Sequence, residues 1–331
     1  MRCVALVLLG LVGGVVPAAA APSCPGNPDA IGTSRTITVD PSALPRIGSM
    51  QYKNTLPLDD HEVAITFDDG PLPPYTDRIL KVLADNCVKV TYFLVGQMAR
   101  AYPQQVRRIY EAGHTIGTHS QHHPFRFDSM GLPRIESEVD DGIASVEAAL
   151  GDPRAVSPFF RIPGLARGKQ VESYLASQKL AVWSADEVAD DWFRHITPEQ
   201  IVNRAIRRIE AHDHRGVLLL HDIHPATAMA LPTLLKELKE RGYHIVQPVA
   251  PGVRPKLPEQ PAPLVAEKEG WPRLAKTSAV AATHPLKKGK HRRKHLARNE
   301  RDPVVAAAIA KKKRKPHSAQ ANSRTPPAVV R

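Results

Sequence analysis

The sequence predicts an α/β fold built on about seven parallel strands, curled into an incomplete barrel. Two observations predict it. Between residues 62 and 250, short apolar or β-branched runs alternate with amphipathic helix-like stretches, a pattern typical of parallel strands joined by crossover helices. Ionisable residues also follow five of these runs, and the carboxyl ends of barrel strands converge on the face that carries the chemistry.

The expected elements follow one another regularly along the chain. The expected strands are 62–67, 88–95, 114–119, 157–162, 180–185, 216–222 and 244–249. The expected helices are 76–86, 103–112, 134–150, 197–212 and 230–241. Together they form one domain, 61–250, with an N-terminal extension, 21–60, before it and a tail, 251–331, after it.

Residues 1–20 have the pattern of a secretory signal peptide. Arg2 supplies the charge, residues 4–16 the apolar stretch, and residues 18–20 a small-residue cleavage site. The apolar stretch is too short to span a bilayer, and no later segment approaches the ~18 apolar residues that a span needs. We therefore expect a secreted or periplasmic protein without a transmembrane anchor.

Two cysteines are expected to remain after export, Cys24 and Cys87, because Cys3 leaves with the signal peptide. An oxidising compartment favours a disulfide between them. It would close a loop of 64 residues and contribute about 4 kcal/mol through loop entropy. The alternative is a buried free Cys87 and a Cys24 in a disordered segment.

The net charge of +12 is concentrated at the carboxyl end. Residues 251–331 hold 20 Lys and Arg against 5 Asp and Glu, a net charge of +15, whereas the remaining 250 residues carry −3. The basic clusters at 287–295 and 311–315, the prolines and the lack of apolar periodicity predict a disordered tail. The tail either holds the protein near an anionic envelope polymer or lipid or has no dedicated partner. Export makes nucleic acid a poor candidate.

The first polar cluster combines two acids with two histidines. Asp68 and Asp69 follow the first expected strand in TFDDGP (66–71), and His119 and His123 follow the third. Asp69 with the two histidines makes a ligand set that suits Zn²⁺ and leaves a position open for water; Co²⁺, Ni²⁺ or Mn²⁺ would fit the same ligands. The metal would lower the pKa of that water, and Asp68 would take its proton as general base.

Each of these signals also has an alternative interpretation. The Asp-Asp-Gly-Pro run is common in surface turns, and His122 competes for either histidine ligand position. Arg161, which ends the fourth strand, could be a structural ion-pair residue. The sixth strand and the residues after it contain His221, Asp222 and His224. These three residues could form a second set of metal ligands or a polar loop.

Five short motifs in order resemble those of polysaccharide deacetylases, the carbohydrate esterase family 4 with the nodulation-deacetylase homology domain. They are TFDDGP (66–71), HSQHH (119–123), RIP (161–163), DDW (190–192) and LLH (219–221). The resemblance covers roughly residues 60–250. It implies a distorted (β/α) barrel and a single catalytic domain.

The resemblance implies a role for individual residues. It implies a catalytic base in Asp68 and metal ligands in Asp69, His119 and His123. Arg161 would orient the base, Asp191 would tune the acid, and His221 would be the general acid that protonates the leaving amine. Trp192 would form an apolar wall, and Leu219 would line the pocket for the acetyl methyl group.

The sequence departs from the family pattern in the third motif. An aromatic residue usually follows Arg-x-Pro, but here the motif continues through Gly164 to Leu165. An aromatic groove wall is therefore missing, and the backbone donor near the oxyanion is expected from Gly164.

The fourth motif departs as well. An Asp normally lies four residues before the Trp, but Val188 occupies that position and Asp186 lies six residues before it. Either Asp190 or Asp191 is therefore available for the tuning role.

The leading hypothesis is a secreted, metal-dependent hydrolase that removes N-acetyl groups from an amino-sugar polymer, releasing free amine and acetate. Peptidoglycan, chitin-like oligomers and poly-N-acetylglucosamine are the candidate substrates. One alternative keeps the site but hydrolyses O-acetyl esters or small amides. Another is an inactive, cationic envelope-binding module.

Overall fold

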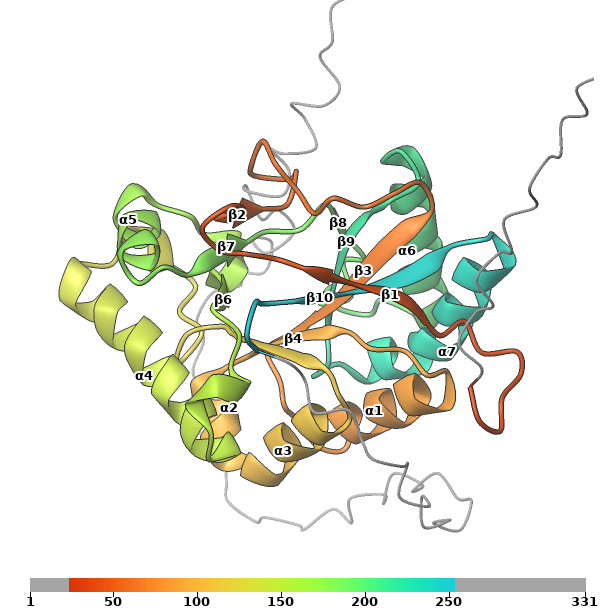
Figure 1. Cartoon of the computed structure of the whole chain (residues 1–331), viewed down its shortest axis with the longest axis horizontal. Coiled ribbons are helices and arrows are strands. Elements are labelled where there is room, and N and C mark those ends of the chain that lie inside the picture. Colours follow the sequence, from red (N-terminus) through yellow and green to blue (C-terminus); the bar gives the residue numbers. More distant parts are fainter. Residues whose placement is uncertain (1–23, 254–331) are drawn as a thin grey trace, which may run out of the picture.

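The computed structural model of the protein describes residues 24–253. The expected signal peptide, 1–20, and the expected tail beyond residue 253 lie outside the described residues. Within the described range, ten strands form one sheet in which every ladder is parallel, and the helices surround it (Figure 1). No helix between residues 24 and 253 has the length and apolar character needed to cross a membrane.

All seven expected strands are present, and three further strands join them. The strands are β1 Thr33–Thr38, β2 Arg46–Ile47, β3 Glu62–Asp68, β4 Thr91–Leu94, β5 Thr115–Thr118, β6 Phe159–Arg161, β7 Ala181–Trp183, β8 Glu187–Val188, β9 Gly216–His221 and β10 His244–Val249. The sequence did not predict β1, β2 and β8. Two of these have only two residues, which is too short to show a period.

All five expected helices are also present. The helices are α1 Tyr75–Asp85, α2 Gly96–Ala101, α3 Pro103–Glu111, α4 Leu132–Leu150, α5 Lys169–Ser177, α6 Pro198–Ala211 and α7 Pro225–Glu240. The sequence did not predict α2 and α5. Helix α7 begins five residues before its expected start at 230, with a proline in its first position, which that residue favours.

The sheet curls into a distorted barrel in which β3 pairs with three other strands. Strand β9 pairs along one side of β3, and β10 and β4 share the other side. The order continues through β5 and β6 to β7. Residues 184–186 then connect β7, which pairs with β6, to β8, which pairs with β9. The chain itself therefore bridges the two edges of the barrel, and the expected fold class is confirmed.

Alternation along the strands separates an inner core from an outer one. On β3, Ile65 and Phe67 pack outward in the cluster that contains the helix residues, whereas Ala64 packs inside with Trp183. Because successive side chains of a strand point to opposite faces, Asp68 lies on the same inner face as Ala64. The same alternation on β6 and β9 turns inward Arg161, Leu219 and His221.

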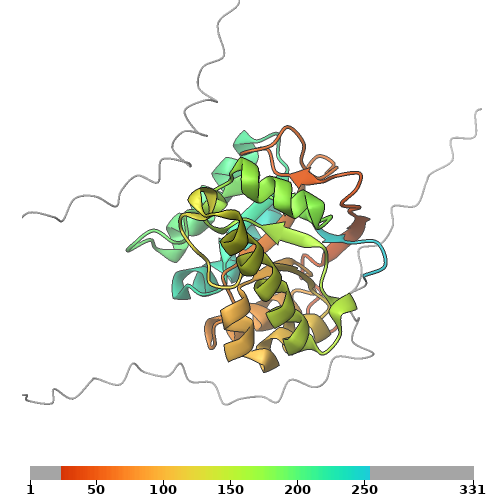
Figure 2. The ribbon, with the colours of Figure 1, turned by 90° about the vertical axis from the view of Figure 1, so that its left-hand side faces the viewer.

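The N-terminal extension is integrated into this sheet. Strand β1 pairs with β10, and β2 pairs with β7, so the extension supplies two strands of the sheet. Figure 2 shows the extension, in red, lying against the rest of the domain. The expected disulfide is present between Cys24 and Cys87, whose Cα atoms are 5.7 Å apart. It joins the start of the described chain to the segment just after α1.

Candidate active site

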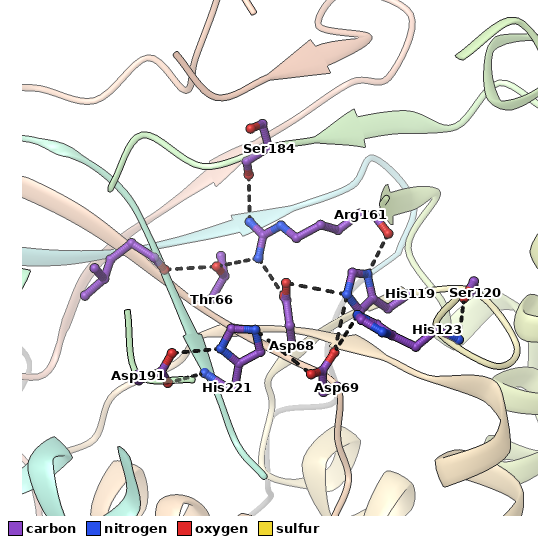
Figure 3. A network of polar contacts seen from close by, with 11 residues as sticks. Thr66, Asp68, Asp69, His119, Ser120, His123, Arg161, Ser184, Asp191 and His221 are labelled. Carbon is purple, nitrogen blue, oxygen red and sulfur yellow. Dashed lines mark hydrogen bonds and ion pairs between the residues drawn. The ribbon is translucent and has the colours of Figure 1, made fainter. Parts of the chain in front are cut away.

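Asp68 is held by a buried arginine at the carboxyl end of β3. Arg161 Nη1 donates to Asp68 Oδ1 at 2.7 Å and to Thr66 Oγ1 at 2.8 Å, and its Nη2 donates to the Ser184 carbonyl at 2.8 Å (Figure 3). Asp68 is 2% exposed and Arg161 0%. The arginine therefore fixes one carboxylate oxygen, and the other lies 3.7 Å from His119 Nε2.

Three potential ligands converge beside it. Asp69 Oδ1 lies 3.4 Å from His119 Nε2 and 3.2 Å from His123 Nε2. This oxygen is buried and has no hydrogen-bond partner, which makes it costly unless a cation occupies the space. The three ligand atoms lie within 4.8 Å of one another. Two imidazoles and one carboxylate fit a divalent cation such as Zn²⁺.

The protonation of His119 suits a ligand. Its Nδ1 donates to the carbonyl oxygen of Arg161 at 2.6 Å, so the lone pair of Nε2 faces Asp69. Burial lowers the pKa of His119 to about 4, despite the nearby Asp68 and Asp69. The ring is therefore neutral at pH 7. Burial opposes the ionisation of Asp69, but the positive charge of His221, the largest of the opposing contributions, lowers the pKa of its carboxyl group.

The turn after β3 lets two adjacent acids face different groups. Asp69 has a φ of 77°, a left-handed conformation that costs a non-glycine residue on the order of 1 kcal/mol. At Gly70, a Cβ atom would lie 2.1 Å from Asp222 Oδ1, so only glycine fits. Thr76 Oγ1 donates to Asp222 Oδ2 at 2.6 Å, and burial raises the pKa of Asp222 to about 7. Asp222 therefore faces α1 and packs beneath the turn.

His221 enters the site from the end of β9. Its Nδ1 donates to Asp191 Oδ1 at 2.8 Å, and its backbone N–H donates to the other oxygen at 2.7 Å, where Thr227 Oγ1 also donates. Burial opposes protonation, but Asp191 and Asp69 raise the pKa of His221 to about 10. The imidazolium Nε2 lies 4.0 Å from Asp69 Oδ2. A proton donor thus faces Asp69 of the ligand set (Figure 3).

The structure separates Asp191 from its neighbouring acid. Asp190 Oδ2 accepts from Arg208 Nη2 at 2.7 Å and from Arg204 Nη1 at 3.1 Å. Asp186 accepts from the backbone N–H of Val217 at 2.8 Å. Of the three aspartates that follow β7, only Asp191 contacts His221 within the described residues, so it is the one positioned to orient that ring.

The alternative ligands are directed elsewhere. His122 Nδ1 lies 3.0 Å from Glu138 Oε1, and its side chain is 61% exposed. Asp222 faces α1, so it does not join His221 and His224 in a second ligand set. Between residues 24 and 253, Asp69, His119 and His123 form the one group of three potential metal ligands.

An apolar cluster borders the acid side of the site. Leu219 is 4% exposed and packs with Leu165, Ala185 and Val188, and both Met50 and Trp192 pack against this cluster. The Trp192 and His221 rings are in edge contact, with 5.4 Å between centroids and 77° between their planes. Leu165 and Val188 occupy the positions where the third and fourth motifs depart from the family pattern.

Gly164 lies in the short 3-10 helix Pro163–Leu165 with a φ of 57°. It is exposed, and a Cβ atom there would meet nothing within 4 Å. The backbone at this position is therefore accessible beside the apolar cluster.

Several residues of the site were not singled out from the sequence. Thr66 precedes Asp68 by two residues on the inner face of β3, so alternation could have indicated it. Ser184 and Thr227 contribute contacts that depend on loop geometry. Met50 belongs to the N-terminal extension, where no motif points to the site.

Comparison with known proteins matches residues 55–183 to the polysaccharide deacetylase family model. A peptidoglycan-N-acetylglucosamine deacetylase from Bacillus cereus is 31% identical over 196 residues, which cover 58% of this chain and 88% of the relative. A second from that organism is 32% identical, covering 54% of this chain and 66% of the relative. A third, from Listeria monocytogenes, is 33% identical, with 56% and 37% covered.

Solved structures show the same fold. A peptidoglycan deacetylase from Bdellovibrio bacteriovorus has a TM-score of 0.58 at 30% identity, over 66% of this chain and 59% of that chain. A carbohydrate esterase 4 pseudoenzyme from Bacillus anthracis has a TM-score of 0.52 at 24% identity, over 58% and 64%, which shows the fold alone. From the match to the family model and the sequence relatives, the chain belongs to the polysaccharide deacetylase family.

Proposed function

We propose that this protein is a secreted or periplasmic, metal-dependent deacetylase that hydrolyses N-acetyl groups of an amino-sugar polymer to free amine and acetate. One observation carries the proposal. The unpartnered oxygen of Asp69 faces two imidazole nitrogens between a carboxylate, Asp68, and an imidazolium, His221. The relatives named for peptidoglycan deacetylation favour peptidoglycan as the polymer, ahead of chitin-like oligomers and poly-N-acetylglucosamine.

The attacking water loses its proton to Asp68. Arg161 holds Asp68 Oδ1 at 2.7 Å, so Oδ2 is the oxygen that accepts the proton. General-base catalysis by a positioned carboxylate contributes about 10²–10⁴-fold to rate. Arg161 also keeps the carboxylate in place, because a buried carboxylate depends on its cationic partner.

The leaving nitrogen takes its proton from His221. The C–N bond breaks, the water oxygen stays with the acetyl carbon, and the products are acetate and the free amine. Asp191 accepts from Nδ1, which leaves Nε2–H directed at the site. The raised pKa of His221, about 10, keeps that proton available at neutral pH.

Asp69, His119 and His123 would hold the cation, and Zn²⁺ is the best match to this ligand set. Co²⁺, Ni²⁺ or Mn²⁺ would fit the same nitrogens and oxygen. When bound, such a cation lowers the pKa of water and polarises the acetyl carbonyl. The orphaned Asp69 oxygen is the feature that supports a cation at this position.

The test is release of free amine and acetate from chitooligosaccharides and from purified peptidoglycan, with and without a chelator. Equal amounts of both products, lost on chelation and restored by Zn²⁺, are expected. Acetate without new amine would favour the O-acetyl esterase. Absence of both products with a metal bound would contradict deacetylation.

An inactive binding module is the second candidate, favoured by the net charge of +15 in residues 251–331. We propose instead that the two roles are divided. The tail binds an anionic envelope polymer or lipid, and the barrel performs the deacetylation. Removal of residues 254–331 should abolish sedimentation with envelope fragments and leave turnover unchanged. Association that survives the truncation would contradict this role for the tail.

A further inference from the structure

We propose that the loop formed by residues 48–55, here called the 48–55 loop, completes the acyl pocket and that Met50 limits the length of the acyl chain. The loop precedes all five sequence motifs. The inference rests on the proposed deacylation, because it names the part of that site which selects the acyl group.

Met50 packs against the apolar cluster that borders the general acid. Its backbone N–H donates to the Ala185 carbonyl at 3.0 Å, and its side chain contacts the cluster that contains Leu219. Leu219 precedes His221 by two residues on the same face of β9. An acyl group whose nitrogen faces His221 therefore has this cluster as its nearest apolar surface.

The 48–55 loop is fastened to the segment after β7. The backbone N–H of Ser49 and the hydroxyl of Thr55 each donate to a different oxygen of Asp186, both at 2.6 Å. Ser49 Oγ also lies 3.0 Å from His212 Nε2. Gly48 has a φ of 110°, and a Cβ atom there would lie 2.7 Å from the Ala185 nitrogen, so the loop lies directly on this segment.

The same loop is fastened to the segment after β6. Gln51 Nε2 donates to the Leu165 carbonyl at 2.7 Å, and Arg167 Nη1 donates to the Gln51 carbonyl at 2.5 Å. The Arg167 guanidinium lies over the Tyr52 ring, 4.6 Å from its centroid.

The loop thus bridges the two segments in which the motifs depart from the family pattern. Asp186, displaced from its usual spacing, receives two of the loop's hydrogen bonds, and the Leu165 carbonyl, which accepts a third, directly follows Gly164, the position of the missing aromatic residue. Bonds on both sides hold the backbone of Met50 in place. Truncation of its side chain should therefore open space in the wall and leave the loop unmoved.

The experiment compares full-length wild type with Met50→Ala, both loaded with Zn²⁺. The matched control is Met130→Ala, because Met130 is also partly buried but packs against the separate cluster around Phe127. Dissociation constants are measured for acetohydroxamic and butyrohydroxamic acids, and kcat/KM for N-acetyl and N-butyryl chitotetraose. A methylene in an apolar pocket changes discrimination by about 10–200-fold, so Met50→Ala should shift the butyryl-to-acetyl ratio at least about tenfold towards butyryl.

The two readouts separate this inference from the proposed function. A shifted hydroxamate ratio without turnover by either protein would support the wall and contradict deacylation. If the proteins turn over substrate, and the butyryl-to-acetyl ratios of Met50→Ala equal those of wild type and Met130→Ala, the assignment of Met50 is wrong. An unshifted hydroxamate ratio without turnover would overturn both.

Discussion

A buried histidine flanks each end of β5, and the two have different partners. At the amino end, His114 Nδ1 accepts the Val90 N–H at 3.2 Å, and its ring packs against Tyr92 with 5.4 Å between centroids. At the carboxyl end, His119 donates from Nδ1 and leaves Nε2 facing Asp69. One residue type on one strand thus stabilises the fold at one end and forms part of the site at the other.

The acids of β3 repeat the difference. At the amino end, both oxygens of Glu62 accept from Arg35 at 2.6 Å, and one also accepts the Asp59 N–H at 2.8 Å. Just past the carboxyl end, Asp69 Oδ1 is buried without a partner. Glu62 and His114 thus each have a hydrogen-bond partner at the amino end, whereas Asp69 Oδ1 at the carboxyl end has none and faces two imidazole nitrogens. The unpartnered oxygen, more than the residue type, marks Asp69 as part of the candidate site.

The largest expected effect is on Asp68. Asp68→Asn should lower kcat by about 10²–10⁴-fold, because an amide cannot take the proton from water. Zn²⁺ stoichiometry should be unchanged, because Asp68 lies outside the proposed ligand set. Turnover and metal content are measured on the same preparation.

The amino end supplies the control for this variant. Glu62→Gln should reduce stability by about 1–3 kcal/mol through weakened hydrogen bonds while leaving kcat unchanged. Full turnover by Asp68→Asn would show that the assigned base is wrong. A large kcat loss in Glu62→Gln would remove the distinction between the two ends.

Two adjacent histidines give a second test of the comparison. His123→Ala should abolish retention of Zn²⁺ after dialysis, because it removes one of three ligands. His122→Ala should keep one Zn²⁺ per chain, because His122 faces Glu138, 3.0 Å away. Metal content is measured by atomic emission. Equal retention by both variants would contradict the ligand set.

The grouping of polar residues at the carboxyl end could be predicted from sequence because these residues occupy short motifs directly after strands. Asp68, Asp69, His119, Arg161 and His221 each follow or end an apolar run, and parallel strands bring such positions together. The order of runs and helices also predicted the sheet. Strands β2 and β8 were not predicted, because two residues are too few to show the alternation of a strand.

The apolar wall could not be predicted in the same way. Met50 packs against the cluster that contains Leu219 only after β2 pairs with β7, a contact between distant segments that no local pattern encodes. The choice between Asp190 and Asp191 likewise depends on which one faces α6. Arg204 and Arg208, both on α6, donate hydrogen bonds to Asp190.

These adjacent acids provide a third, smaller test. Asp191→Asn should lower kcat by about 10–100-fold, as expected for a group that orients a histidine in a metal site. Asp190→Asn should leave kcat unchanged and reduce stability, because it removes the partner of Arg204 and Arg208. Kinetics and thermal unfolding of both variants are compared. A larger kcat loss in Asp190→Asn would reverse the assignment.

The smallest effect concerns the amino end of β5 and depends on pH. Burial lowers the pKa of His114 to about 3, whereas an unfolded histidine titrates near 6.5. Between these values the unfolded chain binds a proton that the folded chain does not, so acid destabilises the fold by about 1.4 kcal/mol per pH unit below 6.5. Stability is unaffected by this group above pH 6.5.

His114→Asn removes that titration, and the Asn oxygen can still accept the Val90 N–H. Between pH 7 and pH 5, wild type should therefore lose about 2 kcal/mol more stability than the variant, measured by urea unfolding at both pH values. An equal loss of stability in both proteins would show that His114 is protonated in the fold, and therefore that water reaches the amino end of β5. The predicted difference would show that His114 stays unprotonated in the fold and makes it sensitive to acid. His119 differs because one of its ring nitrogens faces the proposed ligand set.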